Sequence, residues 1–333
     1  LIWALSIVYR RFTMPASFRK TRIGIQTLIM LPLVGLFIIG ARGGLQYRPI
    51  SPITALQYVD APLSPLVFNT CFSIGTSYQM KGLEEKPYFS DAATVEKWFS
   101  QKKCYAIDSV PMQKKNVVVI ILESFSKYFV QSVSHEKVAY TPFLDSLIRT
   151  GQCYLSEDGF ANARHSNEGS AAILASIPSL MVDPFMTSVY QNNTVTSFAG
   201  ILKQHGYHTA YFHGANNGSM TLDLFTRSCG FDAYYGRNEY PNPDDYDGHW
   251  GIYDEKFLGF FAQKLHETPE PFATALFTLS SHFPYQMPPE YEAIFPKNKD
   301  EDPMFRMVRY TDHSLKLFFD RIKQEPWYAN TLF

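Results

Sequence analysis

The strongest hydrophobic pattern in the chain lies near its N-terminus. Residues Ile23–Gly40 (IGIQTLIMLPLVGLFIIG) carry no charged side chain, and about 18 such residues are close to the length that crosses a bilayer. Leu1–Val8 is also apolar. The segment between these stretches is basic and contains Arg10, Arg11, Arg19, Lys20 and Arg22. Because basic loops are retained on the cytoplasmic side, residues 1–41 are predicted to form a transmembrane anchor: the end of one span, a cytoplasmic loop and a second span.

A buried core helix and a cleaved signal peptide are the alternatives for this region. A core helix leaves the basic flank unexplained. A signal peptide fits poorly because an apolar segment precedes the basic loop and the second segment is long. The chain after Ala41 is therefore predicted to lie on the extracytoplasmic side of the membrane, in the periplasm or at the cell surface.

The following stretch, residues 42–115, has many Pro, Gly and Ser residues and little sustained periodicity. Within it, Ser90–Gln101 begins with a good capping residue and is predicted to be a helix. We interpret residues 42–115 as a connector between the membrane and a folded domain.

From Asn116 onward, strand and helix patterns alternate. NVVVIILES is a β-branched run that ends in Glu123, a pattern typical of a buried parallel strand. Further strands are predicted at Thr209–His213 and Phe272–Leu279. Helices are predicted at Thr141–Thr150, Glu168–Ser176, Thr196–His205, Asp254–His266 and Met304–Ile322. This order predicts an α/β domain over residues 116–333, with a mostly parallel sheet covered by helices on both faces.

Composition excludes some function classes. The net charge is −1 and 18% of residues are charged, whereas a nucleic-acid-binding domain normally has a basic surplus. The cysteines, Cys71, Cys104, Cys153 and Cys229, form no CxxC pair, which excludes zinc-ribbon and thioredoxin-type motifs. An extracytoplasmic location would permit disulfides, but their pairing cannot be deduced from spacing.

Candidate chemistry gathers where predicted strands end. Glu123, His213 and His282 each follow a predicted strand, and ligands of such sheets collect at the carboxyl ends of the strands. The polar cluster Asn162–Gly169 precedes a predicted helix and contains Ser166, near a helix N-terminus that favours an anion. Each has an ordinary alternative: Ser166 as a helix N-cap, Glu123 in a structural ion pair and the histidines as partly buried residues.

The order of the motifs is more specific than any single residue. Together they resemble the lipoteichoic acid synthase and phosphoglycerol transferase family, within the alkaline phosphatase-like superfamily that also holds sulfatases. The resemblance covers residues 116–333 and, more loosely, Arg42–Pro49. The motifs are Val117–Ser124, Arg164–Ser166, Ile177–Ser179, Tyr211–Gly214, Gly230–Asp232, Trp250–Glu255 and Thr278–Pro284.

The resemblance implies a role for each candidate residue. Glu123 matches the carboxylate that binds a divalent metal, with Mn expected ahead of Zn or Mg. Ser166 matches the nucleophile that becomes esterified, and its hydroxyl would also contact the metal. His213 and His282 match histidines of the substrate pocket. Arg164 and Asn162 are further candidates to hold the phosphate.

The resemblance also implies ligands that the sequence does not contain. The family supplies its remaining metal ligands from a late Asp-His pair, and Asn330–Phe333 looks like the start of the strand before it. We therefore expect that pair beyond Phe333, and a chain truncated at its C-terminus that binds metal poorly by itself. Asp312-His313 lies inside a predicted helix, where neighbours point in different directions, and is interpreted as polar helix surface.

The leading functional hypothesis is a membrane-anchored, metal-dependent transferase. Ser166 would take a phosphoglycerol-type unit from a phospholipid head group and pass it to an envelope glycan or alcohol. Ser219–Asp223 lacks the FWNR-like run of members that use phosphatidylglycerol, so the head group stays open. The alternatives are a phosphodiesterase or sulfatase-like hydrolase of the same fold, and a non-catalytic envelope-binding relative. No cysteine lies in the CxPxR context of a classical sulfatase.

Overall fold

The computed structural model describes residues 23–78, 80–100, 111 and 113–333. The chain divides into two compact units, residues 1–50 and residues 51–333. Each unit is described by itself.

The described part of the first unit is dominated by one apolar helix, α2 (Ile23–Arg42). By length and composition, Gly24–Arg42 could cross a membrane. Pro32 lies inside this helix, as is tolerated in membrane helices. The helix coincides with the second predicted span. The first predicted span, Leu1–Val8, and the basic loop up to Arg22 lie outside the described residues.

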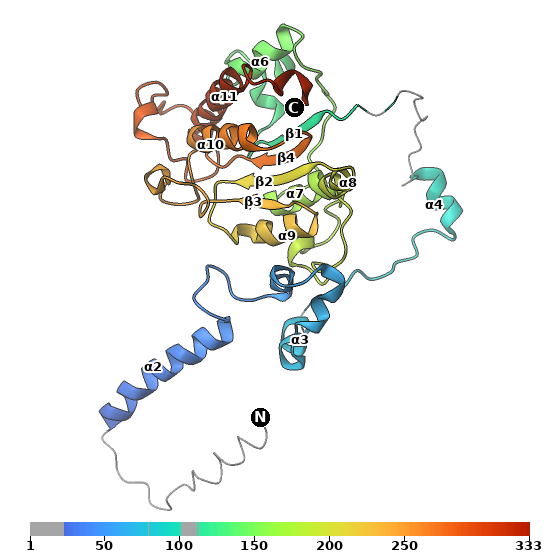
Figure 1. The fold of residues 1–333 in the computed structure, drawn as a ribbon, viewed down its shortest axis with the longest axis vertical. Coiled ribbons are helices and arrows are strands. Elements are labelled where there is room, and N and C mark those ends of the chain that lie inside the picture. The colour runs from blue at the N-terminus through green and yellow to red at the C-terminus, as the bar shows by residue number, and fades with distance from the viewer. Residues whose placement is uncertain (1–22, 79, 101–110, 112) are drawn as a thin grey trace, which may run out of the picture. The chain divides into compact units, whose positions relative to one another are not determined.

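The second unit is built on a parallel sheet with the strand order β3-β2-β4-β1-β5 (Figure 1). All neighbouring strands pair in parallel, which confirms the predicted fold class. The strands are β1 (Asn116–Ile121), β2 (His208–His213), β3 (Ala233–Tyr235), β4 (Phe272–Phe277) and β5 (Thr331–Leu332).

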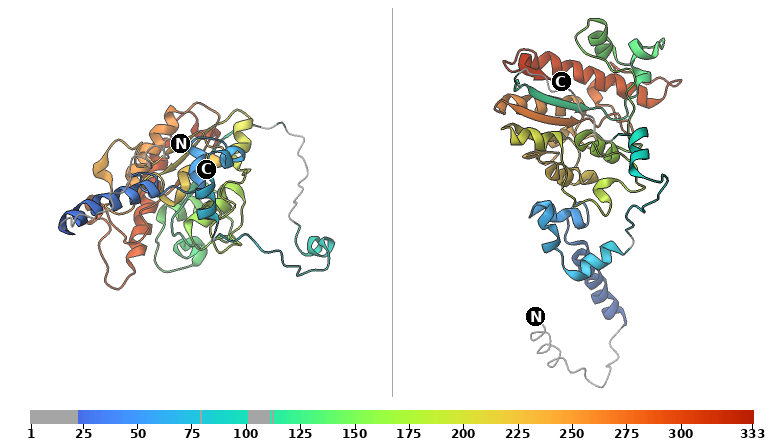
Figure 2. Two further views of the ribbon diagram at one scale, coloured as in Figure 1. Left: turned by 90° about the horizontal axis from the view of Figure 1, so that it is seen from below. Right: turned by 90° about the vertical axis from the view of Figure 1, so that its right-hand side faces the viewer.

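Helices cover both faces of this sheet (Figure 2). On β2, Phe212 packs against Phe261 with ring centroids 4.6 Å apart, whereas its neighbour Tyr211 belongs to the core cluster that contains Leu174. Because side chains alternate along a strand, these two residues mark opposite faces. α10 and α11 lie over the first face and α7, α8 and α9 over the second. The helices are α6 (Pro142–Arg149), α7 (Ser166–Ala175), α8 (Phe198–Gln204), α9 (Leu222–Ser228), α10 (Asp254–Glu267) and α11 (Pro303–Ile322).

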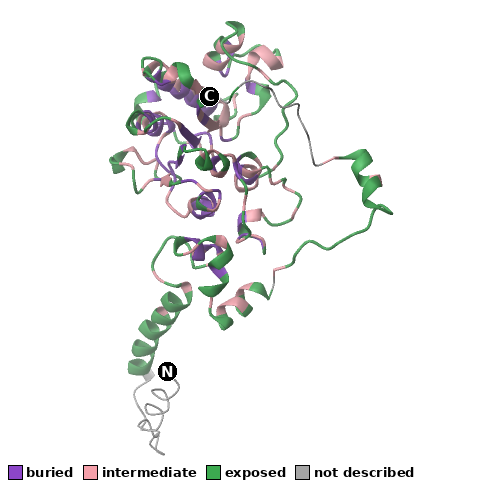
Figure 3. Ribbon diagram, turned by 45° about the vertical axis from the view of Figure 1, so that its right-hand side comes forward, coloured by how far each residue is buried: buried purple, intermediate pink, exposed green. Residues whose placement is uncertain are grey.

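Part of the segment interpreted as a connector lies in the core of the second unit. Residues Pro52–Gln57 form a short 3-10 helix in which Ile53 and Leu56 are 0% and 2% exposed. Gln191 Oε1 accepts a hydrogen bond from the Ile53 N–H. Figure 3 shows the contrast between this buried stretch and the exposed helix α4 (Ala92–Trp98).

Cysteine pairing was left open by the sequence. In the described part of the chain, Cys71, Cys153 and Cys229 are free thiols, and Cys229 is buried. Cys104 lies outside the described residues.

Asp312 is not part of a polar helix surface, so that interpretation was wrong. The side chain is fully buried on α11, and its carboxylate oxygens accept hydrogen bonds from the N–H groups of Phe143 (2.8 Å) and Leu144 (3.1 Å). The first turn of α6 needs such acceptors, because Thr141 makes no side-chain cap. Burial raises the pKa of Asp312 to about 6.

His213 closes β2 and is fully buried. Its ring stacks on Phe277 with centroids 4.7 Å apart, and its Nδ1 lies 3.1 Å from the Phe277 carbonyl oxygen. Its Nε2 has no hydrogen-bond partner among the described residues. Burial lowers the pKa of His213 from 6.5 to about 4, so the folded protein holds a neutral imidazole at neutral pH.

We expect the contribution of His213 to the free energy of unfolding to fall as the pH drops from 6.5 toward 4, whereas the raised pKa of Asp312 acts in the opposite direction over the same window. In this window the unfolded chain binds a proton at His213 that the folded chain does not, which amounts to about 3 kcal/mol when complete. His213→Gln should remove this contribution to the slope, as measured by urea unfolding at pH 7 and pH 4.5. The matched control is His208→Gln, because His208 lies exposed at the other end of β2. Equal slopes in wild type and His213→Gln would contradict the assignment.

Candidate active site

Glu123 lies just past the carboxyl end of β1, the strand between β4 and β5. Only 9% of it is exposed. The next residue, Ser124, has a left-handed backbone with φ 57°, an uncommon conformation for a residue other than glycine. The Ser124 hydroxyl donates a hydrogen bond of 2.8 Å to Glu123 Oε1. The turn after the strand therefore fixes one oxygen of the carboxylate.

Ser166, which lies 43 residues after Glu123 in the chain, contacts the other oxygen of the Glu123 carboxylate. It is the first residue of α7, and the helix N-cap is His165, which makes no side-chain cap. The Ser166 hydroxyl instead donates to Glu123 Oε2 at 2.7 Å. The capping alternative for Ser166 thus does not describe its side chain, which contacts a carboxylate 43 residues away.

These two residues line a cavity of about 500 Å³. The other polar lining residues are Arg164, His165, Asn167, Glu168 and His282, and the apolar ones are Val182, Pro184 and Met220. The cavity therefore brings together Glu123, Ser166, Arg164 and His282 of the residues predicted for the site. A cation, an imidazole and a hydroxyl around one hollow can contact a phosphate or sulfate group.

Two predicted residues lie elsewhere. His213 is buried at the end of β2 and does not line this cavity. Asn162 is exposed, and its Oδ1 accepts a hydrogen bond of 2.9 Å from the Ser179 N–H. Asn162 therefore connects the loop before α7 to the loop after it.

His282 is positioned by its neighbours. Its Nδ1 lies 2.7 Å from the Phe283 carbonyl oxygen, and since a carbonyl only accepts, Nδ1 carries the proton in this arrangement. The Trp250 ring lies against the imidazole, with centroids 4.3 Å apart. The Nε2 atom is thereby left as the nitrogen able to exchange a proton with a bound molecule.

Sequence reasoning did not single out Glu168, which braces the loops around Ser166. Its carboxylate accepts hydrogen bonds from the Ser179 hydroxyl (2.9 Å) and the Arg164 N–H (3.2 Å) and pairs with His165 (3.3 Å). Burial acts to raise the pKa of Glu168, but the hydrogen bonds from Ser179, His165 and Arg164 outweigh it and the pKa is lowered. The sequence signal that could have identified Glu168 is its position two residues after Ser166 in the polar cluster.

Met220 was also missed as a lining residue. Met220 and Thr221 both have left-handed backbones, with φ 52° and 59°. Such conformations are strained for residues other than glycine and are found most often near functional sites. The hydrophobic periodicity of the sequence does not predict a left-handed backbone at these two positions.

The residues present fit part of a site for a hard divalent cation. Glu123 Oε2 and Ser166 Oγ are oxygen donors 2.7 Å apart, and oxygen ligands suit Mg²⁺ and Mn²⁺. Within the described residues, no group of three or more His, Cys, Asp or Glu side chains could hold a metal ion. A complete coordination sphere would therefore need ligands in addition to these two.

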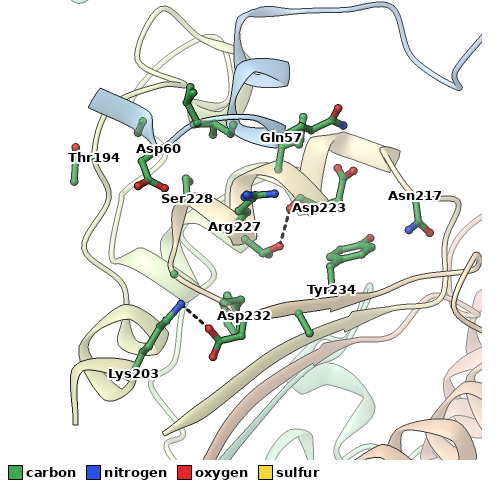
Figure 4. Close-up of a pocket in the computed structure, with 18 of the residues that line it drawn as sticks. Gln57, Asp60, Thr194, Lys203, Asn217, Asp223, Arg227, Ser228, Asp232 and Tyr234 are labelled. Carbon is green, nitrogen blue, oxygen red and sulfur yellow. Dashed lines mark hydrogen bonds and ion pairs between the residues drawn. The ribbon is translucent and has the colours of Figure 1, made fainter. Parts of the chain in front are cut away.

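A second cavity, of about 710 Å³, lies beside α9 and β3 (Figure 4). Its other wall is formed by the turn from Leu56 to Pro62. Lys203 and Asp232 face one another there, with Nζ and Oδ1 2.5 Å apart. This cavity contains none of the residues predicted for the active site.

Comparison with known proteins gives a consistent result. The sulfatase family model matches residues 115–333. Lipoteichoic acid synthase-like YvgJ of Bacillus subtilis (strain 168) is 30% identical over 66% of this chain and 36% of its own length. The chain spans about a third of the length of the curated relatives that it matches first.

Two solved structures share the fold. A protein of the alkaline phosphatase superfamily from Vibrio parahaemolyticus is 26% identical, with a TM-score of 0.59 over 67% of this chain and 53% of that one. The lipoteichoic acid synthase LtaP from Listeria monocytogenes is 23% identical, with a TM-score of 0.58 over 66% of this chain and 54% of that one. The resemblance drawn from the motifs is thus confirmed, and because the family model spans most of the second unit, the chain belongs to the sulfatase family.

Proposed function

We propose that this protein transfers a phosphoglycerol-type unit from a phospholipid head group to an envelope glycan or another alcohol, through a covalent intermediate on Ser166. The single observation that carries the proposal is the hydrogen bond of 2.7 Å between the Ser166 hydroxyl and Glu123 in a cavity that also holds Arg164 and His282. The named relative YvgJ, a lipoteichoic acid synthase-like protein, supports the choice of a phosphate ester.

In the first step, Ser166 Oγ attacks the phosphorus of the donor. A P–O bond to Ser166 forms and the P–O bond to the lipid alcohol breaks. Glu123 Oε2 accepts the hydrogen bond of the attacking hydroxyl, orients it and takes up its proton as the bond to phosphorus forms. Arg164 balances the negative charge of the phosphate. His282, protonated at both ring nitrogens for this step, is proposed to give its Nε2 proton to the departing lipid oxygen.

In the second step, the acceptor hydroxyl attacks the same phosphorus. The neutral His282 Nε2 now takes the acceptor's proton, and the bond to Ser166 breaks. The serine oxygen regains its proton from Glu123, and the hydrogen bond between them is restored. Water in place of the alcohol would give the hydrolase alternative with the same residues.

Glu123 and Ser166 Oγ are the residues proposed to hold a divalent cation, with Mn²⁺ expected ahead of Zn²⁺ or Mg²⁺. A cation bound there would help to ionise the serine hydroxyl and would offset the charge of the phosphate. The additional ligands are proposed to be an Asp-His pair beyond Phe333.

The apolar helix α2 supports the proposed membrane location. It would anchor the protein in the bacterial inner membrane, next to the phospholipid donor, with the domain from residue 116 on the extracytoplasmic side. Residues 42–115 would lie between the two, and within this range Pro52–Gln57 packs into the core of the second unit. The proposed partners are thus a lipid donor, a glycan or alcohol acceptor and the membrane, and no nucleic acid.

We expect Ser166 to carry the intermediate. The protein extended past Phe333 would be incubated with Mn²⁺ and phosphatidylglycerol labelled in its head group, and the adduct located by mass spectrometry. Glycerol phosphate should be found on Ser166, and Ser166→Ala should lower turnover by at least about a thousandfold.

The matched control for this experiment is Ser170→Ala, one turn further along α7. Ser170 is buried and donates to the Ser166 carbonyl oxygen at 2.8 Å, so the adduct should persist. An adduct on Ser170 would contradict the assignment of the nucleophile. Cleavage of a phosphodiester or sulfate ester without an adduct would favour the hydrolase, and neither adduct nor cleavage would favour another donor or a binding role.

We expect Glu123→Gln to weaken Mn²⁺ binding by at least about tenfold, as measured by isothermal titration calorimetry on the same extended protein. Substitution of residues that only orient metal ligands already costs about 10- to 100-fold. The control is Glu168→Gln, because Glu168 lines the same cavity but is engaged by Ser179 and His165. Loss of binding in Glu168→Gln with normal binding in Glu123→Gln would overturn the assignment of the metal ligand.

A further inference from the structure

Glu123 is held in place by its backbone as well as by its side chain. Its N–H donates to Thr278 Oγ1 at 2.9 Å, and its carbonyl oxygen accepts from Ser281 Oγ at 2.5 Å. Both hydroxyl residues are buried, at 2% and 0% exposed. Since β1 ends at Ile121, the peptide groups of Glu123 lie past the strand ladder and take these hydroxyls as partners.

The segment Thr278–Ser281, which holds Glu123, itself lies past the end of β4. Its Thr278 N–H still bonds to the Ile121 carbonyl oxygen at 3.0 Å, but the next two N–H groups point elsewhere. Leu279 N and Ser280 N both donate to Asp254 Oδ1, at 2.7 and 3.1 Å. The Asp254 N–H in turn donates to Ser280 Oγ at 2.9 Å. One carboxylate oxygen therefore fixes the course of this segment.

Burial of the Asp254 carboxylate at this position is unfavourable in free energy, because a charged group loses its hydration. It is 3% exposed, and no ion pair within the described part of the chain includes it. Its Oδ2 accepts a hydrogen bond of 2.7 Å from the hydroxyl of Thr311 on α11. The side chain that donates to this carboxylate is therefore uncharged. Burial raises the pKa of Asp254, and the hydrogen bonds from Leu279, Thr311 and Ser280 act against that rise. As the first residue of α10, it also lies where the helix dipole favours a negative charge.

The other end of the same segment holds His282. Trp250 Nε1 donates to the Phe283 carbonyl oxygen at 2.5 Å, and the Trp250 ring lies against His282. Gly251 forms a β-bridge with Ala215, and a Cβ at Gly251 would come 2.3 Å from the Gly214 carbonyl oxygen. The Trp250–Glu255 motif therefore contacts the Thr278–Pro284 motif at two points. Trp250 bonds to Phe283, and Asp254 bonds to Leu279 and Ser280.

We propose that Asp254 is a positioning residue of the active site: its carboxylate fixes Thr278–Ser281, and through this segment it holds the backbone of Glu123 at Ser166. The inference rests on the proposed roles of Glu123 and Ser166. Asp254 does not line the cavity, so its effect must pass through the hydroxyls of Thr278 and Ser281.

Hydrogen exchange followed by mass spectrometry tests the inference on the chain as it is. In Asp254→Ala, the Leu279 and Ser280 amides should exchange about 10- to 100-fold faster, because each loses a bond to a charged acceptor. The decisive amide is that of Glu123, which bonds to Thr278 and not to Asp254. We expect its exchange to rise at least about tenfold. Asp254→Asn keeps an acceptor oxygen and should restore most of the protection.

The matched control is Asp312→Ala. Asp312 is likewise buried and accepts from two consecutive N–H groups, those of Phe143 and Leu144. Its removal should accelerate exchange at those two amides and leave Glu123 protected. If Asp254→Ala does not fold, Asp254→Ser replaces it, since one hydroxyl oxygen retains a weaker acceptor for the same amides.

Two results would overturn the inference. One is exposure of Leu279 and Ser280 with an unchanged Glu123 amide, which would make Asp254 a local support only. The other is equal acceleration at Glu123 in Asp312→Ala, which would reflect general destabilisation. Exchange needs no turnover, so failure to find an adduct on Ser166 would leave this result intact. Where turnover is measured, Asp254→Asn should lower kcat and leave KM within about threefold.

Discussion

Parallel strands end at one edge of the sheet, and each peptide group beyond that edge must find a partner that is not a strand. The candidate active site of this protein is organised by that constraint. The N–H and carbonyl of Glu123 take hydroxyls from the segment after β4, and this segment takes its own acceptor from the start of α10. The groups that satisfy the backbone past the strands also fix the side chains at the mouth of the cavity.

Two buried carboxylates accept hydrogen bonds from backbone N–H groups of this kind. Asp254 accepts two consecutive N–H groups after β4, and Asp312 accepts two at the first turn of α6. A carboxylate oxygen can accept more than one hydrogen bond and needs no partner cation when several donors surround it. The protein thus combines a sheet that is apolar on both faces with a small number of anionic groups at the points where regular structure stops.

Much of this arrangement could be predicted from the sequence, and the limits have physical causes. The run before Glu123 and the amphipathic pattern of Met304–Ile322 are local signals, so the strands and helices that were predicted lie within a few residues of the observed ones. The short elements β3 and α9 were not predicted. The pairing of Ser166 with Glu123 in one cavity followed from the order of the motifs. The burial of Asp312 and of Ile53 depends on which elements meet in space, and neither a helix pattern nor an irregular segment reveals that. The positions of His213 and Met220 depend likewise on packing and on an unusual backbone.

The left-handed backbone at Thr221 has a consequence for protein engineering. A β-branched residue at φ 59° holds about 1–2 kcal/mol of conformational strain that glycine would not, although the Thr221 side chain is itself buried. A designer who wishes to widen the cavity beside Met220 must remove packing atoms and so lose stability. The strained position next to it is where part of that loss could be recovered without touching Glu123 or Ser166, which makes the loop after β2 the natural place to begin redesign of the pocket.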